Sequence, residues 1–235
     1  MLRTILALVV SGLFELVIGL PLLLVAWIRG TAGPLYPVVV TGLRLAFAVA
    51  GLRIRLEGAE NIPPGSCLFM SNHTSTLDPM AVFISAPRRI AFMAKKELFE
   101  IPFLGLSMRS AQFISVDRSN REAAAASANR AVSQLCQGVS LVIYPEGTRS
   151  PDGRLLPFKR GAFLIAIRAG RPVVPMTITG AERALSKGER WIRPGEIVIR
   201  FHPAMDVSGY AEDDRELLRE RVRAAIAAGL PPALR

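Results

Sequence analysis

Apolar positions are distributed unevenly along the 235-residue chain, and the first part is the most apolar. Residues 4–28 contain one charge, Glu15, and one helix-disrupting residue, Pro21, and residues 35–52 form a second apolar stretch that only Arg44 interrupts. A helix of 25 residues would be roughly 37 Å long and could cross a hydrocarbon core of about 30 Å. Such interruptions are also typical of helices that lie in the membrane interface. The pattern therefore predicts a membrane-associating element that spans the bilayer or lies on it.

A cleaved signal peptide is the competing interpretation of the same segment. Its basic leader would be only residues 1–3, the apolar run is too long, and no clear A-x-A site follows. We therefore expect residues 1–56 to form hydrophobic membrane-associating helices and residues 57–235 to form a separate α/β domain.

From Arg53 onward, short apolar runs alternate with longer amphipathic segments. Ser119 and Glu122 have the spacing of a capping box at the start of an Ala-rich helix that ends at Gly138. This alternation favours a largely parallel sheet covered by helices on both faces. The strands are expected at 67–70, 90–94, 113–116, 139–144, 172–178 and 196–202, and further helices at 80–85, 161–169 and 212–228.

The amino-acid composition excludes some classes of protein and favours others. Apolar residues make up 51% and charged residues 20%, which excludes a disordered chain. The 29 basic and 19 acidic residues give a formal charge of +10, which favours nucleic acid, anionic lipid or phosphorylated small molecules as partners. Aromatic residues are only 7% and do not interleave with the basic ones, which argues against nucleic acid. The two cysteines, Cys67 and Cys136, form neither a disulfide framework nor a C-x-x-C pair.

His73 and Asp78 are the first candidate catalytic pair. On one continuous helix, five residues of separation would point the two side chains about 140° apart. Pro79 disfavours a helical conformation at Asp78, so residues 73–78 are expected to form a loop that brings the carboxylate to the imidazole. The carboxylate would then orient the ring and leave its other nitrogen free as a base. The alternative is a solvated histidine beside an aspartate that only caps a helix. His202 has no comparable partner and is expected to be structural.

A second candidate site is the Gly-containing turn 144–150 after a predicted strand. Gly147 allows the chain to bend sharply, and a guanidinium such as that of Arg149 can grip a phosphate with two N–H groups. Further basic residues follow strand ends: Arg118 after Asp117, and Lys95 with Lys96. Each of these is also compatible with ordinary surface charge. Together they stand at the ends of successive strands, where open α/β sheets bind ligands.

The order of these segments resembles the 1-acylglycerol-3-phosphate acyltransferases of the phospholipid and glycerol acyltransferase superfamily. The matching blocks are NHTSTLD at 72–78, FISVDR at 113–118, YPEGTRS at 144–150, FKRG at 158–161 and VVPMTI at 173–178, with Tyr144 where the family has Phe.

The resemblance implies transfer of a fatty acyl group from acyl-ACP or acyl-CoA to the free sn-2 hydroxyl of 1-acylglycerol-3-phosphate, giving phosphatidic acid. It implies His73 as the general base, Asp78 as its orienter, and no metal or other cofactor. It also implies an N-terminal two-helix element on the bilayer. The residues that it assigns to substrate binding are Arg118, Glu146, Gly147, Thr148, Arg149 and Lys159.

Several alternatives remain open at this stage. Another lyso-lipid, such as lyso-ornithine lipid, could be the acceptor, and a non-catalytic lipid-binding protein of the membrane surface would leave both polar sites unexplained. A serine hydrolase is disfavoured because the chain has no G-x-S-x-G. The arginines that follow the first apolar run outnumber the single Arg3 before it, which places the catalytic domain on the cytoplasmic face of an anionic membrane.

Overall fold

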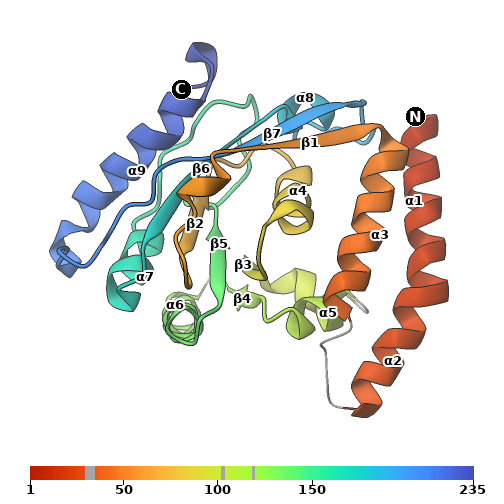
Figure 1. The fold of residues 1–235 in the computed structure, drawn as a ribbon, viewed down its shortest axis with the longest axis horizontal. Helices are drawn as coiled ribbons and strands as arrows, with labels where there is room; N and C mark the ends of the chain where they lie inside the picture. The colour runs from red at the N-terminus through yellow and green to blue at the C-terminus, as the bar shows by residue number, and fades with distance from the viewer. Residues whose placement is uncertain (30–34, 102–103, 118–119) are drawn as a thin grey trace.

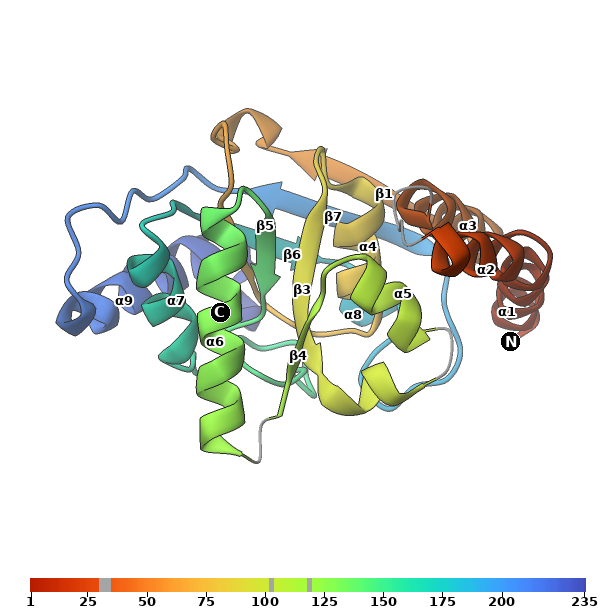
Figure 2. The same cartoon turned by 90° about the horizontal axis from the view of Figure 1, so that it is seen from below.

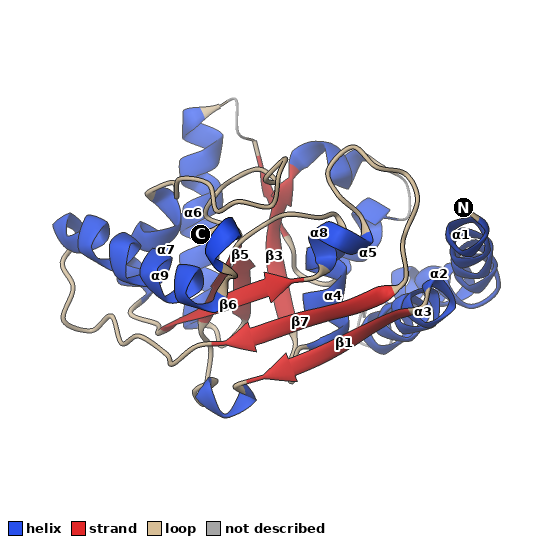
Figure 3. Cartoon of the chain, turned by 90° about the horizontal axis from the view of Figure 1, so that it is seen from above, coloured by secondary structure: helices blue, strands red, loops and turns tan. Residues whose placement is uncertain are grey.

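The computed structural model describes residues 1–29, 35–101, 104–117 and 120–235. Seven strands in these residues form one sheet: β1 (Leu52–Glu57), β2 (Leu68–Ser71), β3 (Ile90–Lys95), β4 (Ile114–Val116), β5 (Ser140–Ile143), β6 (Val173–Thr179) and β7 (Gly195–Phe201). Their order is β1-β7-β6-β2-β5-β3-β4, and every neighbouring pair is parallel except β6 and β7. Figure 3 shows the arrow of β7 running opposite to that of β6 and in the same direction as that of β1. The expectation of a largely parallel sheet is confirmed.

Helices cover both faces of the sheet because side chains alternate along each strand. In β2, Phe69 packs into one core, while Leu68 and Met70 pack into the other. The first core lies under α3 (Leu35–Ala50), α4 (Leu77–Ser85) and α8 (Ala181–Ala184). The second lies under α6 (Arg121–Cys136), α7 (Gly161–Ala169) and α9 (Arg215–Gly229), on the other side of the sheet (Figures 1 and 2). Short helical segments between and after these elements are η2 (Ala59–Asn61), η3 (Lys96–Glu100), α5 (Leu104–Ser110), η4 (Glu212–Asp214) and η5 (Pro232–Leu234).

The N-terminal apolar segment forms one long helix that lies beside α3 (Figure 1). It consists of α1 (Leu2–Phe14), a π-helical turn η1 (Glu15–Gly19) and α2 (Leu20–Arg29). Residues Leu2–Val25 are long and apolar enough to cross a membrane, a test that an N-terminal signal sequence also passes. Most of this helix is exposed, including Leu8, Leu13 and Val17, whereas Ala7 contributes to the first core.

The sheet begins before the 56/57 boundary that the sequence predicts between membrane element and α/β domain. Strand β1 occupies Leu52–Glu57 and pairs along its whole length with β7, so residues 52–56 belong to the sheet. Alternating apolar and basic residues in β1 suit a strand with one face on the core, and that face packs against the apolar helices.

Two helix starts also differ from the sequence expectation. Helix α4 begins at Leu77, so Asp78 is helical and Pro79 occupies the first turn, where a missing N–H costs no intrahelical bond. Helix α6 begins at Arg121, and its cap is Asn120, whose side chain accepts the Ala123 N–H at 3.0 Å. Ser119 of the expected capping box lies outside the described residues.

Candidate active site

The candidate active site lies where β2 ends, and a buried asparagine holds that strand end in place. The Asn72 amide donates to the Ile178 carbonyl at 2.8 Å, and its oxygen accepts the Ile178 N–H at 2.8 Å. The side chain thus reproduces the hydrogen bonds of one more strand residue toward β6. This clamp determines where the following residue, His73, leaves the sheet.

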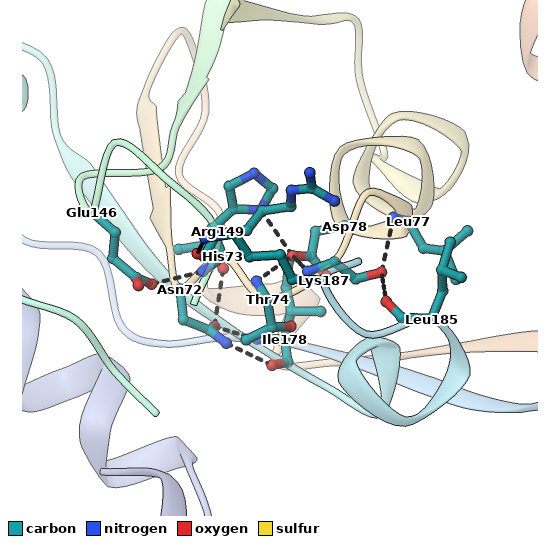
Figure 4. A network of polar contacts seen from close by, with 12 residues as sticks. Asn72, His73, Thr74, Leu77, Asp78, Glu146, Arg149, Ile178, Leu185 and Lys187 are labelled. Atoms are coloured by element: carbon teal, nitrogen blue, oxygen red, sulfur yellow. Dashed lines mark hydrogen bonds and ion pairs between the residues drawn. The ribbon is translucent and has the colours of Figure 1, made fainter. Parts of the chain in front are cut away.

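His73 and Asp78 are brought together by the tight loop that the sequence predicted. The His73 Nδ1 lies 2.9 Å from Asp78 Oδ2, and the same oxygen accepts the backbone N–H groups of Thr74 at 2.7 Å and Ser75 at 2.8 Å (Figure 4). The Asp78 side chain is fully buried, whereas that of His73 is 18% exposed. Because Nδ1 faces a carboxylate, the proton belongs on Nδ1, and Nε2 is left as the base.

The imidazole is also positioned by an aromatic ring. Tyr144 stacks on His73 with ring centroids 4.2 Å apart and 20° between the planes. The Tyr144 hydroxyl is buried and has no hydrogen-bond partner among the described residues. The contact with His73 is therefore made by the ring, which a phenylalanine would also supply.

Glu146 lies behind the catalytic loop, where it binds main chain. Its Oε1 accepts the His73 N–H at 2.7 Å, and its Oε2 accepts the Leu156 N–H at 3.2 Å. The side chain is only 3% exposed, and burial raises its pKa from 4.5 to about 7 against the opposing effect of the two N–H groups. Each carboxylate oxygen thus accepts an N–H of the chain itself, and the substrate contact that the sequence resemblance implies for Glu146 stays a prediction. No local pattern in the sequence signals this role.

The turn that contains Glu146 also holds His73 from the other side. The Ser150 N–H donates to the His73 carbonyl at 2.7 Å, and Ser150 is buried. The backbone of His73 is therefore held at its N–H and at its carbonyl by residues of one turn, 146–150. The catalytic loop 73–78 and the turn 146–150 are far apart in the sequence but form a single structural unit.

Basic side chains border this unit on its exposed side. Gly147 has φ +72°, a backbone conformation that favours glycine, and its Cα lies close to the end of the Lys159 side chain. Arg149 is half-buried, while Thr148 and Lys159 are exposed. Among the described residues, no hydrogen bond or ion pair engages the Arg149 guanidinium. These side chains can receive an anionic ligand next to His73.

Two of the remaining basic candidates, Lys95 and Lys96, are each paired with a carboxylate. Lys96 lies 2.6 Å from Asp117, and Lys95 pairs with Glu97 at 2.9 Å. Arg118 lies outside the described residues. In the described part of the chain, no group of three or more His, Cys, Asp or Glu side chains could hold a metal ion.

His202 has the structural surroundings that the sequence indicated. Its Nε2 lies 2.7 Å from the Thr177 hydroxyl, which also donates to the Ile226 carbonyl of α9 at 3.0 Å. Burial, and then the nearby Arg200 charge, lower the pKa of His202. The ring links β6 and β7 to α9 on the second core's side and has no carboxylate partner among its described contacts.

Lys187 is a residue near the site that the sequence reasoning missed. Its ammonium donates to the Arg149 main-chain carbonyl at 2.8 Å (Figure 4). It lies in the loop between α8 and β7, outside all of the motif blocks. A lone lysine in a loop carries no sequence signal of its own.

Comparison with known proteins decides the family. The sequence profile of the Acyltransferase family matches residues 53–179, more than half of the chain. The chain belongs to this acyltransferase family.

Individual relatives agree with this family. The 1-acyl-sn-glycerol-3-phosphate acyltransferase of Limnanthes douglasii is 37% identical over 194 residues, which cover 81% of this chain and 68% of the relative. The human enzyme called 1-acyl-sn-glycerol-3-phosphate acyltransferase alpha is 35% identical over 175 residues, which cover 74% of this chain and 62% of the relative.

A solved structure extends the similarity to the whole fold. The 1-acyl-sn-glycerophosphate (LPA) acyltransferase PlsC from Thermotoga maritima superposes with a TM-score of 0.78 at 28% identity. The superposition covers 97% of this acyltransferase and 95% of PlsC, so the N-terminal helices are included. The resemblance drawn from the sequence blocks is therefore confirmed.

Proposed function

We propose that this acyltransferase moves a fatty acyl group from acyl-ACP or acyl-CoA to the sn-2 hydroxyl of 1-acylglycerol-3-phosphate and so forms phosphatidic acid. Relatives and the superposed structure carry the name of this reaction. The observation that carries the mechanism is the pairing of His73 Nδ1 with the fully buried Asp78 carboxylate at 2.9 Å.

The chemistry follows from that pairing. His73 Nε2 removes the proton of the acceptor hydroxyl as its oxygen attacks the thioester carbonyl. A C–O bond forms, the C–S bond breaks, and the imidazolium returns the proton to the departing thiolate. Asp78 stabilises the transient positive charge on the ring. The acceptor hydroxyl is the nucleophile, so the reaction requires no nucleophilic serine or cysteine of the enzyme.

We assign binding of the acceptor's phosphate to the polar and basic side chains beside His73, which are Thr148, Arg149 and Lys159. The Arg149 guanidinium is half-buried and has no partner in the described residues, and Thr148 and Lys159 lie exposed on the same turn and the segment after it. A guanidinium can bind a phosphate with two N–H groups. Glu146 and Gly147 support these side chains indirectly. Glu146 accepts the His73 N–H, and the positive φ of Gly147 permits the bend of the turn that carries Thr148 and Arg149.

We place the enzyme on the cytoplasmic face of the membrane, where the exposed apolar helix enters the bilayer. Support comes from the exposed leucines and valines of α1 and α2 and from the arginines that follow the first apolar run. The acyl donors of the proposed reaction are water-soluble thioesters, which would reach the site from the same side.

Substitution of the two histidines tests the assignment of the base. His73→Ala should lower acyl transfer by about 10²–10⁴-fold, and Asp78→Asn should be nearly as severe. His202→Ala is the matched control and should keep most activity. Purified full-length protein would be assayed against 1-acylglycerol-3-phosphate, lyso-ornithine lipid and other lyso-lipids, with acyl-ACP and acyl-CoA. A dead His202 variant with an active His73 variant would contradict the mechanism, and a preference for another lyso-lipid would contradict the substrate.

A further inference from the structure

The loop between α8 and β7, residues 185–194, connects the catalytic loop to the apolar N-terminal helix. At one end, the Leu185 carbonyl accepts the Ser75 hydroxyl at 2.6 Å. Near the other end, the Ile192 N–H donates to the Thr4 hydroxyl of α1 at 2.8 Å. Figure 3 shows this loop running from α8 to the start of β7 near α1. The loop therefore lies between the N-terminal helix and the loop that holds His73.

Lys187 is the residue of this loop that reaches the candidate active site. Its side chain is exposed, and its ammonium donates to the Arg149 carbonyl at 2.8 Å (Figure 4). No carboxylate forms an ion pair with it within the part of the chain that the structure describes. An ammonium has three donors, so two remain for a ligand. A second positive charge thus lies next to Arg149 without being neutralised.

We infer that Lys187 and Arg149 together bind the phosphate of the acceptor lipid, and that Lys187 makes the enzyme select a phosphate monoester over a phosphate diester. This inference rests on the proposed function. A phosphate monoester carries about −1.5 to −2 charges at pH 7, whereas a diester carries one. The second cation therefore contributes more to binding of the monoester. Arg149 supplies the planar fork, and Lys187 supplies a point charge.

The position of the loop agrees with this role. The lyso-lipid keeps its acyl chain in the bilayer, so its phosphate lies at the height of the lipid headgroups while its hydroxyl reaches His73. Lys187 is held between the helix that contacts the bilayer and the loop that holds the base. It can therefore contact the phosphate while the hydroxyl is at Nε2.

Kinetics of full-length protein in neutral detergent micelles test the inference. Lys187→Ala should raise the KM for 1-acylglycerol-3-phosphate by roughly tenfold or more, because a charge-assisted contact is lost. The kcat should stay within about twofold, because the contact exists before and during the reaction alike. Lys187→Arg should restore most of the affinity. Arg190→Ala, which removes an exposed charge from the same loop, is the control and should leave the KM unchanged.

The selectivity measurement separates recognition of the phosphate from general attraction. The same variants would be assayed with 1-acylglycerophosphoglycerol, a diester, as substrate or as competitive inhibitor. Lys187→Ala should weaken binding of the diester much less than binding of the monoester. The Arg149→Ala/Lys187→Ala double variant should lose less binding free energy for the monoester than the sum of the two single losses, since both side chains contact the same phosphate.

Two results would overturn the inference. The first is an unchanged KM of Lys187→Ala in neutral micelles, whether or not sedimentation with anionic vesicles weakens. The second is an equal loss of kcat for both lipids together with a lower melting temperature, which would make Lys187 only a support of the Arg149 backbone. An inactive wild-type enzyme on 1-acylglycerol-3-phosphate, or an active His73→Ala variant, would instead contradict the proposed function.

Discussion

His73 is positioned by two buried carboxylates that act on different parts of the residue. Asp78 contacts the ring, and Glu146 contacts the backbone N–H. The ring partner was predictable, because a loop of this length before a helix start brings the two side chains together. The backbone partner was not, because Glu146 lies 73 residues away and meets His73 only after β2 and β5 have paired.

Glu146 should make the stability of the protein depend on pH. Its folded-state pKa of about 7 lies above its ordinary value of 4.5, so the folded protein binds more protons than the unfolded chain between these values. The contribution of this group to stability is present below pH 4.5 and is lost as pH rises through 7. Between pH 5 and 8 the loss should be about 2–3 kcal/mol.

Urea unfolding of full-length protein in neutral micelles checks this pH dependence. The free energy of unfolding of wild type should fall more between pH 5 and 8 than that of Glu146→Gln, because the amide of the variant does not titrate. Glu60→Gln, which changes an exposed carboxylate, should retain the wild-type dependence. Parallel curves for wild type and Glu146→Gln would show that the Glu146 pKa is not raised in the folded protein.

At the level of elements, the site depends on how β2 ends and how α4 begins. The Asn72 clamp extends β2 toward β6, and α4 starts two residues before Pro79. The sequence analysis expected this helix at 80–85, after the proline. The actual start is earlier because Asp78 accepts the N–H groups of the preceding loop and Pro79 still falls within the first turn, which needs no donor.

Asn72→Ala should destabilise the fold and reduce activity together. It leaves the Ile178 N–H and carbonyl unpaired in a buried place, and each such group costs about 1–3 kcal/mol. Asn120→Ala, which removes the exposed cap of α6, should cost only about 1 kcal/mol and leave kcat unchanged. Equal losses of unfolding free energy in the two variants would argue against the clamp.

At the level of the whole molecule, an exposed apolar face runs along α1 and α2 at one end of the structure (Figure 1). Leu13 and Leu24 are each 56% exposed on this helix, and Leu217 is 53% exposed on α9, at the opposite end of the molecule (Figure 1). A leucine buried in lipid contributes about 1.5–3 kcal/mol. In the proposed membrane-bound state, the apolar contribution to binding therefore comes from one end of the molecule, next to the helices that pack on the first core.

Substitution of these leucines tests the membrane contact without removing core residues. Leu13→Asp/Leu24→Asp should weaken binding to anionic vesicles by roughly two orders of magnitude or more, whereas Leu217→Asp should bind as wild type does. Salt should weaken wild-type binding without abolishing it, because the apolar contribution is not screened. Sedimentation of all three proteins would be compared. If the double variant binds as well as wild type, the basic surface of the catalytic domain must hold the enzyme on the membrane.

The sequence alone determined the features that depend on neighbouring residues. The period of apolar positions indicated the α/β sheet and the apolar N-terminal helices, and the spacing of His73 and Asp78 indicated a catalytic pair, because a short loop restricts where its side chains can go. The basic turn at 144–150 was likewise visible as a ligand-binding candidate.

Tertiary structure decided what depends on segments far apart in the chain. Pairing of β1 with β7 moved residues 52–56 into the sheet, packing of the turn 146–150 against β2 turned Glu146 toward the His73 backbone, and the α8–β7 loop brought Lys187 to Arg149. None of these contacts has a local signature, since the partners are chosen by strand order and by burial, which only the folded chain defines.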